Sequence, residues 1–416
     1  MRKNILLLWL LLLPIVTSAQ LVFSLEAYRD SVYLNSTALG NASIEVERAV
    51  ARERIAKTDF LPSLSASSSF TIDFRHSDGA DLWGFTLQPR VEQILYGGGG
   101  IRSAYRRAVT QKQMAEQDEL MAFLEERYAA DKAYYTLSAM QLYRAATEEY
   151  TSIIRSLCRI VEERFREGYV AKSDLLQVQT RLSEAEYSLL EMANDYEVAL
   201  HRFNNLRGVI DSSDVVLKNS IIDSLALPVR MSVRDIFERR PDMRAAMLAI
   251  GSAEQGVNVV RSQYNPRLTA GVSGSWQTYS PNSSGKTYWD GALIVGLNVP
   301  IFHWGERRSA VAVAKADIAR AENGVEQLMR DVAQQEADGW SAMMSSYSQI
   351  QSSLQNLQLA GENLTISTYS YQEGRATVLD VLQAQISWLQ LYTNAITARF
   401  NYALSVADYQ RITADE

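Results

Sequence analysis

The sequence repeats itself at an offset of about 206 residues, and this duplication limits the possible folds more than any other feature. The segment Phe165–Gln177 returns as Tyr371–Gln383, with a glycine at the same place in both copies. With the same offset, Tyr96–Gly99 matches Phe302–Gly305. A repeat of this length predicts two copies of one structural unit lying beside each other. Such pseudo-symmetry favours a wall or a tube over a single catalytic cleft.

Residues 1–19 have the pattern of a signal peptide. Two basic residues precede an apolar run, Ile5–Val16, and small residues follow it. The alternative is an N-terminal anchor helix, although the run is short for a bilayer. Cys158 is the only cysteine, so neither an intrachain disulfide nor lipidation at the cleavage point is expected. The formal net charge of -7 disfavours nucleic acid as a partner.

Heptad patterns predict a long helical hairpin in each half, at about 100–206 and about 305–412. Apolar residues recur with spacings of three and four from Leu175 to Phe203, as in a coiled-coil seam. Longer helices without proline are expected before each seam, from about 102 to 167 and from about 307 to 373. At about 1.5 Å per residue each would span roughly 100 Å. Tight turns are expected at Gly168 and Gly374, with Ser173-Asp174 and Thr377 capping the helices that follow.

Before each helical hairpin the sequence period changes to two, which predicts β-hairpins at about 62–95 and about 266–301. Four strands of about twelve residues each are apolar on one side, for example at Leu64, Phe70 and Val295. This pattern suits an outer-membrane barrel, and the alternative is a soluble sandwich. Four strands cannot close a barrel, and open edges are not tolerated in lipid. Several chains would therefore have to share one barrel.

These features together resemble the outer-membrane efflux protein family, also called the TolC family. The resemblance rests on the paired halves, the tip glycines, Leu95–Gly99, Pro300–Phe302 and Arg239–Asp242. It implies a mixed α and β membrane protein: a homotrimer with a twelve-stranded β-barrel in outer-membrane lipid and an α-barrel of coiled-coil hairpins across the periplasm. It also implies two partners, a periplasmic adaptor (membrane fusion) protein and an inner-membrane transporter.

The expected organisation is a signal peptide (1–19), a first repeat (20–207), an equatorial linker (208–231) and a second repeat (232–416). The expected function is a passive outer-membrane exit duct of a tripartite efflux pump. The alternatives are the duct of a type I protein secretion system and, in another class, a soluble periplasmic coiled-coil scaffold. The sequence does not identify the transported substrate.

The resemblance assigns the function to the two tips, where the tube can close and the adaptor docks. The expected aperture residues are Asp380, Gln383, Asp174 and Tyr371. The expected docking residues are Gly168, Ser173, Gly374 and Thr377. Carboxylates repeated around a narrow opening repel one another and attract cations. The alternative for both aspartates is a solvated acid in the first turn of a helix, and Gln383 would contribute only a weaker polar ring.

The sequence contains no recognisable catalytic, cofactor or metal motif. Gly97–Gly100 is not followed by the Lys-Ser or Lys-Thr of a phosphate-binding loop. The three histidines form no HExxH pattern, and Ser65–Ser69 lack the GxSxG elbow of a serine hydrolase. We therefore expect a protein that is not an enzyme and needs no cofactor.

Overall fold

The computed structural model describes residues 21–72, 83–210, 215–223, 226–278 and 287–415. The expected signal peptide and both expected strand turns lie outside these ranges. The chain divides into two compact units. Unit 1 comprises Met1–Ala38, Phe123–Met231 and Gln335–Glu416, and unit 2 comprises Leu39–Ala122 and Ser232–Gln334. The two longest helices pass through both units.

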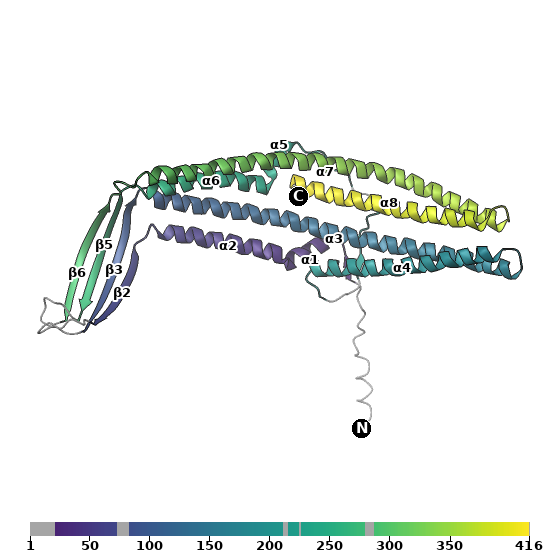
Figure 1. The fold of residues 1–416 in the computed structure, drawn as a ribbon, viewed down its shortest axis with the longest axis horizontal. Helices are drawn as coiled ribbons and strands as arrows, with labels where there is room; N and C mark the ends of the chain where they lie inside the picture. Colours follow the sequence, from purple (N-terminus) through teal and green to yellow (C-terminus); the bar gives the residue numbers. More distant parts are fainter. Residues whose placement is uncertain (1–20, 73–82, 211–214, 224–225, 279–286, 416) are drawn as a thin grey trace, which may run out of the picture. The chain divides into compact units, whose positions relative to one another are not determined.

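Unit 2 contains a four-stranded antiparallel sheet (Figure 1). Its strands, in the order β2-β3-β5-β6, are β2 (Ser63–Ile72), β3 (Trp83–Gly97), β5 (Arg267–Gln277) and β6 (Tyr288–Asn298). Since directly opposed residues share a face, the pairing of Val91 with Val272 and of Val272 with Leu293 confirms the expected apolar face. Among the described residues, β2 and β6 each pair on one side only. The sheet is therefore open at two edges.

Three further helices lie mainly in unit 2 and precede its strands along the chain. They are α2 (Thr37–Thr58), α5 (Val233–Arg239) and α6 (Pro241–Ser262). Pro241 occupies the first turn of α6, where its missing N–H costs nothing. The buried Arg240 guanidinium binds both carboxylate oxygens of Asp242, at 2.9 and 2.6 Å. Arg240, Pro241 and Asp242 thus form the N-terminal end of α6.

The two helical hairpins are present as expected. The first joins α3 (Gly100–Arg166) to α4 (Lys172–Leu206), and the second joins α7 (Glu306–Gln372) to α8 (Val378–Thr413). The ends of both long helices agree with the sequence prediction to within two residues. Leu175, Val178, Ala185, Tyr196 and Phe203 are buried, which confirms the α4 seam. Within the described ranges, no helix is both long and apolar enough to cross a bilayer.

A small parallel sheet in unit 1 was not predicted from the sequence. It pairs β1 (Leu21–Phe23) with β4 (Val215–Leu217), which lies in the expected linker. Tyr28, in α1 (Leu25–Asn35), stacks on Phe203 at 3.8 Å between ring centroids and donates to its carbonyl at 3.0 Å. The Tyr134 hydroxyl lies 3.1 Å from the carbonyls of Phe23 and Asn219. The linker and the N-terminal strand are thus fixed against α3 and α4.

Two buried carboxylates on the long helices are each paired with an arginine from a connecting segment. Arg29 of α1 binds both oxygens of Asp131 in α3, at 2.5 and 2.6 Å. Arg230 of the linker binds both oxygens of Glu336 in α7, at 2.9 and 3.0 Å. Buried carboxylates require such partners because desolvation of an isolated charge is costly. An arginine from an earlier segment of the chain therefore holds each long helix near its middle: α1 holds α3, and the linker holds α7.

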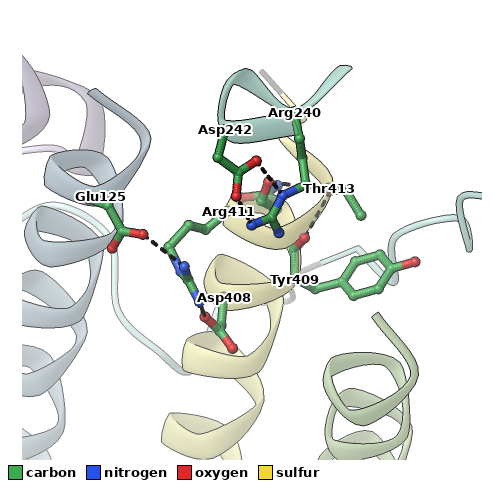
Figure 2. Close-up of polar contacts among 8 residues, drawn as sticks. Glu125, Arg240, Asp242, Asp408, Tyr409, Arg411 and Thr413 are labelled. Carbon is green, nitrogen blue, oxygen red and sulfur yellow. Dashed lines mark hydrogen bonds and ion pairs between the residues drawn. The ribbon is translucent and has the colours of Figure 1, made fainter. Parts of the chain in front are cut away.

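A third arginine ties the end of α8 to α3, also within unit 1. Arg411 donates to Glu125 of α3 at 2.9 Å and to Asp408, one turn earlier on α8, at 2.8 Å (Figure 2). Arg127 donates to the carbonyl of Asp415 at 2.9 Å. These bonds hold the C-terminal turn of α8 against the first hairpin.

Candidate aperture at the helical tips

The two turns at the hairpin ends have the same backbone geometry. Gly168 has φ of 80° and Gly374 has φ of 71°, in the left-handed region that favours glycine. At the first tip, Tyr169 N–H donates to the carbonyl of Arg164 and Gly168 N–H to that of Phe165. Arg375 and Gly374 repeat this pair of bonds at the second tip. Both turns are Schellman motifs, so the duplication in sequence is a duplication in structure.

The helices that follow the two turns begin differently. Thr377 caps α8, and its hydroxyl accepts from the backbone N–H of Asp380 at 3.3 Å. The Asp380 carboxylate accepts from the backbone N–H of Thr377 at 2.8 Å and from its hydroxyl at 2.7 Å, which completes a capping box. These bonds lower the pKa of Asp380, the bond from the hydroxyl most of all.

At the first tip the expected cap is wrong. The helix α4 begins at Lys172, one residue before Ser173, so the N-cap position falls on Ala171, which has no side chain to accept a bond. Ser173 instead lies in the first turn and donates to Asp174 at 3.4 Å. The reason is that the N-cap position equivalent to Thr377, 206 residues earlier in the repeat, is occupied by Ala171. The second tip consequently carries the stronger N-terminal cap.

One apolar cluster in unit 1 joins the two tips. It contains side chains from all four helices: Leu157, Cys158, Val161, Leu175, Val178, Tyr371, Val378, Val381 and Leu382. The lone cysteine of the chain is buried in this cluster, and burial raises the pKa of its thiol. Because apolar burial is the main attractive force here, the two tips pack as one body rather than as two independent loops.

Arg164, in the last turn of α3, connects the tips through polar contacts. Its guanidinium donates to the carbonyl of Tyr371 at 3.1 Å and to that of Gln372 at 2.7 Å. It also lies 4.8 Å from the centroid of the Tyr371 ring. The last carbonyls of a helix lack partners within it, and a cation is favoured at that end. One side chain of the first hairpin thus caps the C-terminal end of α7.

Tyr371 is the most enclosed of the predicted site residues, with a side chain only 5% exposed. Burial raises the pKa of its phenol, Arg164 partly opposes this, and the charge of Asp174 adds to it. The first-tip aspartate thus acts on the second-tip tyrosine. The Tyr371 hydroxyl has no hydrogen-bond partner among the described residues. We find the same for Oε1 of Gln385, which is buried two turns into α8.

The structure separates the predicted aperture residues into two groups. Asp380 and Gln383 are exposed on α8, whereas Tyr371 is buried and Asp174 is half-buried. Sequence reasoning missed Arg164 and Gln385. The basic residue in the last turn of α3 was a usable signal for Arg164. Gln385 gave no signal, because a glutamine between apolar residues on a helix fits a solvent-facing position equally well.

The described residues contain no group of three or more His, Cys, Asp or Glu side chains able to hold a metal ion. The largest groove in unit 1 among the pockets described, about 670 Å³, lies between α7 and α8. It is lined by hydroxyl and amide side chains, including Ser345, Ser352, Asn394 and Asn401. Neutral polar walls of this kind suit contact with water or with another protein better than catalysis.

The duplicated sequence of this chain matches the model of a known protein family. The family model described as "Outer membrane efflux protein" matches residues 29–209 and again residues 233–413, once on each half. This chain belongs to the outer membrane efflux protein family. Membership rests on most of both repeats, from α1 to the end of α8, and it confirms the resemblance seen in the sequence.

Individual members of the family are similar over most of the chain. The pyoverdine export outer membrane protein OpmQ of Pseudomonas aeruginosa is 24% identical over 381 residues, covering 87% of this chain and 78% of OpmQ. The alkaline protease secretion protein AprF of the same species is 22% identical over 349 residues, covering 79% and 69%. The cation efflux system protein CusC of Escherichia coli (strain K12) is 22% identical over 418 residues, covering 92% and 84%.

A crystal structure of CusC shows the same fold. It matches the present structure with a TM-score of 0.83 at 17% sequence identity, over 94% of this chain and 91% of that one. The combination of paired helical hairpins with a four-stranded sheet is therefore the fold of an outer membrane efflux protein. Similarity at this level of identity assigns the fold but not the role of the tips.

Proposed function

We propose that this protein is the outer-membrane exit duct of a tripartite efflux pump, assembled as a homotrimer. The observation that carries the proposal is the open sheet β2-β3-β5-β6 in a chain of this family. Its apolar face is exposed, with Leu293 at 78% and Val295 at 66%. An open edge is not tolerated in lipid, so further strands must complete the sheet. Three copies would give twelve strands, an even number that can close a barrel.

The proposed orientation places the sheet in the outer membrane and the helical hairpins in the periplasm. The chain would reach this location through the signal peptide at 1–19. The apolar face of the sheet would contact lipid, and the opposite face, with Ser65, Ser67 and Ser275, would line water. In this arrangement residues 20–207 and 232–416 are the two repeats of each subunit, and residues 208–231 join them at the equator.

The proposed function of the tips follows from their contacts. Asp380 and Gln383 are exposed and would repeat around the threefold axis, where carboxylates attract cations. Arg164 and Tyr371 hold the two hairpins together, so they would set how easily the aperture opens. The exposed turns at Gly168, Ser173, Gly374 and Thr377 would receive the periplasmic adaptor.

Transport through this duct is proposed to be passive. The described residues offer no nucleotide-binding loop, and the energy would come from an inner-membrane transporter acting through the adaptor. The duct itself needs no catalytic residue or cofactor for this task. Its walls enclose the path of the substrate, and its aperture controls entry to that path.

Photocrosslinking at the tips tests the proposal. A photoreactive amino acid at Ser173, which is exposed at the tip, should capture a periplasmic adaptor in intact cells. The matched control is Glu322, which is exposed on α7 within unit 2. Capture of the adaptor from position 173 alone supports the duct. A chain that fractionates without detergent and captures no adaptor would instead be the soluble coiled-coil scaffold.

A second candidate is the outer-membrane duct of a type I protein secretion system. The similarity to AprF, whose name describes alkaline protease secretion, favours including it. The same crosslinking experiment separates the two, because the transporter recovered with the adaptor differs. A secretion complex would bring down an ATP-driven exporter together with a secreted protein, whereas an efflux pump would bring down a small-molecule transporter.

A further inference from the structure

The end of the sheet where the strands meet the helices is strongly basic in an otherwise acidic chain. The register places Ser63, Gly97, Arg267 and Asn298 toward this end of unit 2. The four segments that connect there are 54–62, 97–108, 261–267 and 299–308. They contain nine basic residues: Arg54, Lys57, Arg102, Arg106, Arg107, Arg261, Arg267, Arg307 and Arg308. Their only acidic residues are Asp59 and Glu306. We call these nine residues the basic collar.

The collar residues have no ion-pair partners in the parts of the chain that the structure describes. Among the described residues, none of the nine forms an ion pair with a carboxylate. Many arginines elsewhere do so, including Arg48 and Arg52, which both pair with Glu45 on α2. Exposed cations that are gathered without ion-paired carboxylates raise one another's energy and favour an external anion. The collar is therefore complementary to a negatively charged partner.

An apolar pocket lies within the collar, between α2 and α3. Its volume is about 330 Å³, and it is lined by Arg54, Lys57, Thr58, Phe60, Leu61 and Tyr105. The rings of Phe60 and Tyr105 meet edge to face at 5.9 Å between centroids. Leu61 remains 63% exposed. The pocket thus combines an apolar wall with two cationic side chains. This combination is complementary to an anionic lipid headgroup attached to an acyl chain.

Exposed apolar side chains lie beside the collar residues, in the segment between β6 and α7. Ile301 is 92% exposed, and Phe302 and Trp304 pack edge to face at 4.8 Å between ring centroids. Trp304 has φ of 48°, in the left-handed region, where its counterpart in the first repeat is Gly98 with φ of 63°. A bulky residue at such a φ is strained. The second repeat therefore keeps a tryptophan in solvent contact at a position that glycine would occupy without strain.

We propose that the basic collar binds anionic phospholipid in the membrane leaflet that faces the helices. Arg54 and Lys57 bind the headgroup phosphate, and the pocket wall of Phe60, Leu61 and Tyr105 receives the start of an acyl chain. Trp304 and Phe302 enter the same interface, where tryptophan is favoured because its ring is amphipathic. The inference rests on the proposed membrane location of the sheet, whose strands lead directly into the collar segments. The bound lipid fixes the depth of the sheet in the bilayer.

Lipid titration of the assembled protein tests this inference. The detergent-extracted protein is stripped of lipid and titrated with phosphatidylglycerol or phosphatidylcholine of the same acyl chains, with binding followed by native mass spectrometry. Phosphatidylglycerol should bind roughly tenfold more tightly, as expected for one or two basic side chains close to an anionic headgroup. The double variant Arg54→Gln/Lys57→Gln should lose this preference. The matched control on the same helix, Arg48→Gln/Arg52→Gln, should retain it.

Two outcomes overturn the inference. One is equal binding of the two lipids, or an unchanged preference in Arg54→Gln/Lys57→Gln. The other is displacement of phosphatidylglycerol by inorganic phosphate, which would mean a site for a free anion. Trp304→Gly supplies an independent readout. It should reduce quenching of tryptophan fluorescence by brominated phosphatidylglycerol without lowering the melting temperature, because glycine relieves the strain. A protein that inserts and conducts but shows no lipid preference refutes this inference alone, whereas failure to insert refutes the proposed function.

Discussion

The Arg164 guanidinium donates to the carbonyl of Tyr371 at 3.1 Å and lies 4.8 Å from the centre of its ring, so the first helical hairpin caps the end of the second. The repeat contains no counterpart of this contact, since the residue equivalent to Arg164 in the second copy is Ser370. The two tips therefore share a backbone geometry while differing in the bonds that hold them. A gate that must open can be regulated at such a contact.

Arg164→Gln should loosen the second tip. The change removes charge-assisted hydrogen bonds to two helix-end carbonyls, worth about 1 to 3 kcal/mol. Hydrogen exchange at residues 371–377 should become faster, and the conductance of the closed duct should rise. Arg166→Gln is the matched control, because Arg166 is exposed and pairs only within α3, with Glu162 at 3.1 Å. Equal exchange rates in the two variants would show that Arg164 does not hold the tips.

Thr377→Ala and Asp380→Asn should separate the cap of α8 from the charge at the aperture. Thr377→Ala removes the N-cap hydroxyl, at about 0.5 to 2 kcal/mol of local stability, and keeps the carboxylate. Asp380→Asn removes the charge and retains one oxygen that can accept a bond. Single-channel recordings should therefore show a weaker cation preference in Asp380→Asn and an unchanged preference in Thr377→Ala. If neither variant alters selectivity, Asp380 is only a capping residue.

The sequence predicted the repeated parts of this fold and missed what joins them. Helix and strand positions follow from local periodicity, so α3 and α7 were located to within two residues. The pairing of β1 with β4 depends on two three-residue segments nearly 200 residues apart, and segments so short have no recognisable period. The tip glycines were visible because a left-handed φ selects glycine. Arg164 was missed because its partners are backbone carbonyls, which any sequence supplies.

At the candidate site, too, one local prediction was right, and features that depend on packing were missed. The capping role of Thr377 followed from its position after a turn, and the structure confirms it. The same reasoning failed at Ser173, because α4 already begins at Lys172 and Ala171 occupies the N-cap position. The burial of Tyr371 could not be predicted, because it depends on an apolar cluster to which another helix contributes Leu157 and Val161.

Arg29→Met should destabilise unit 1 because it leaves the carboxylate of Asp131 without its ion-pair partner. Asp131 is 2% exposed, and loss of its arginine leaves a buried charge without compensation, at about 3 to 5 kcal/mol. The melting temperature of the assembled protein should fall. Arg29→Met combined with Asp131→Leu should recover much of the loss, because it removes the buried charge as well. A double variant as unstable as the single one would mean that packing, and not charge, explains the effect.

Charge should be harmful on one face of the sheet and tolerated on the other. Val295→Arg places a cation on the apolar face, at about 2 to 4 kcal/mol near the middle of a bilayer. Ser275→Arg lies on the opposite face, directly across from Asp290 on β6, so the new charge gains a neighbour of opposite sign. Quantitative blotting of the outer-membrane fraction should show depletion of the first variant only. Equal loss of both would contradict the proposed lipid-facing side.

Several chains must complete the open sheet β2-β3-β5-β6 if it is to form one duct. Native mass spectrometry of the mature protein extracted in mild detergent tests this requirement most directly. We expect a complex of three chains, with monomer appearing only under conditions that also abolish conductance in planar bilayers. A stable monomer that still conducts ions, or an assembly whose strand number cannot close a barrel, would contradict it.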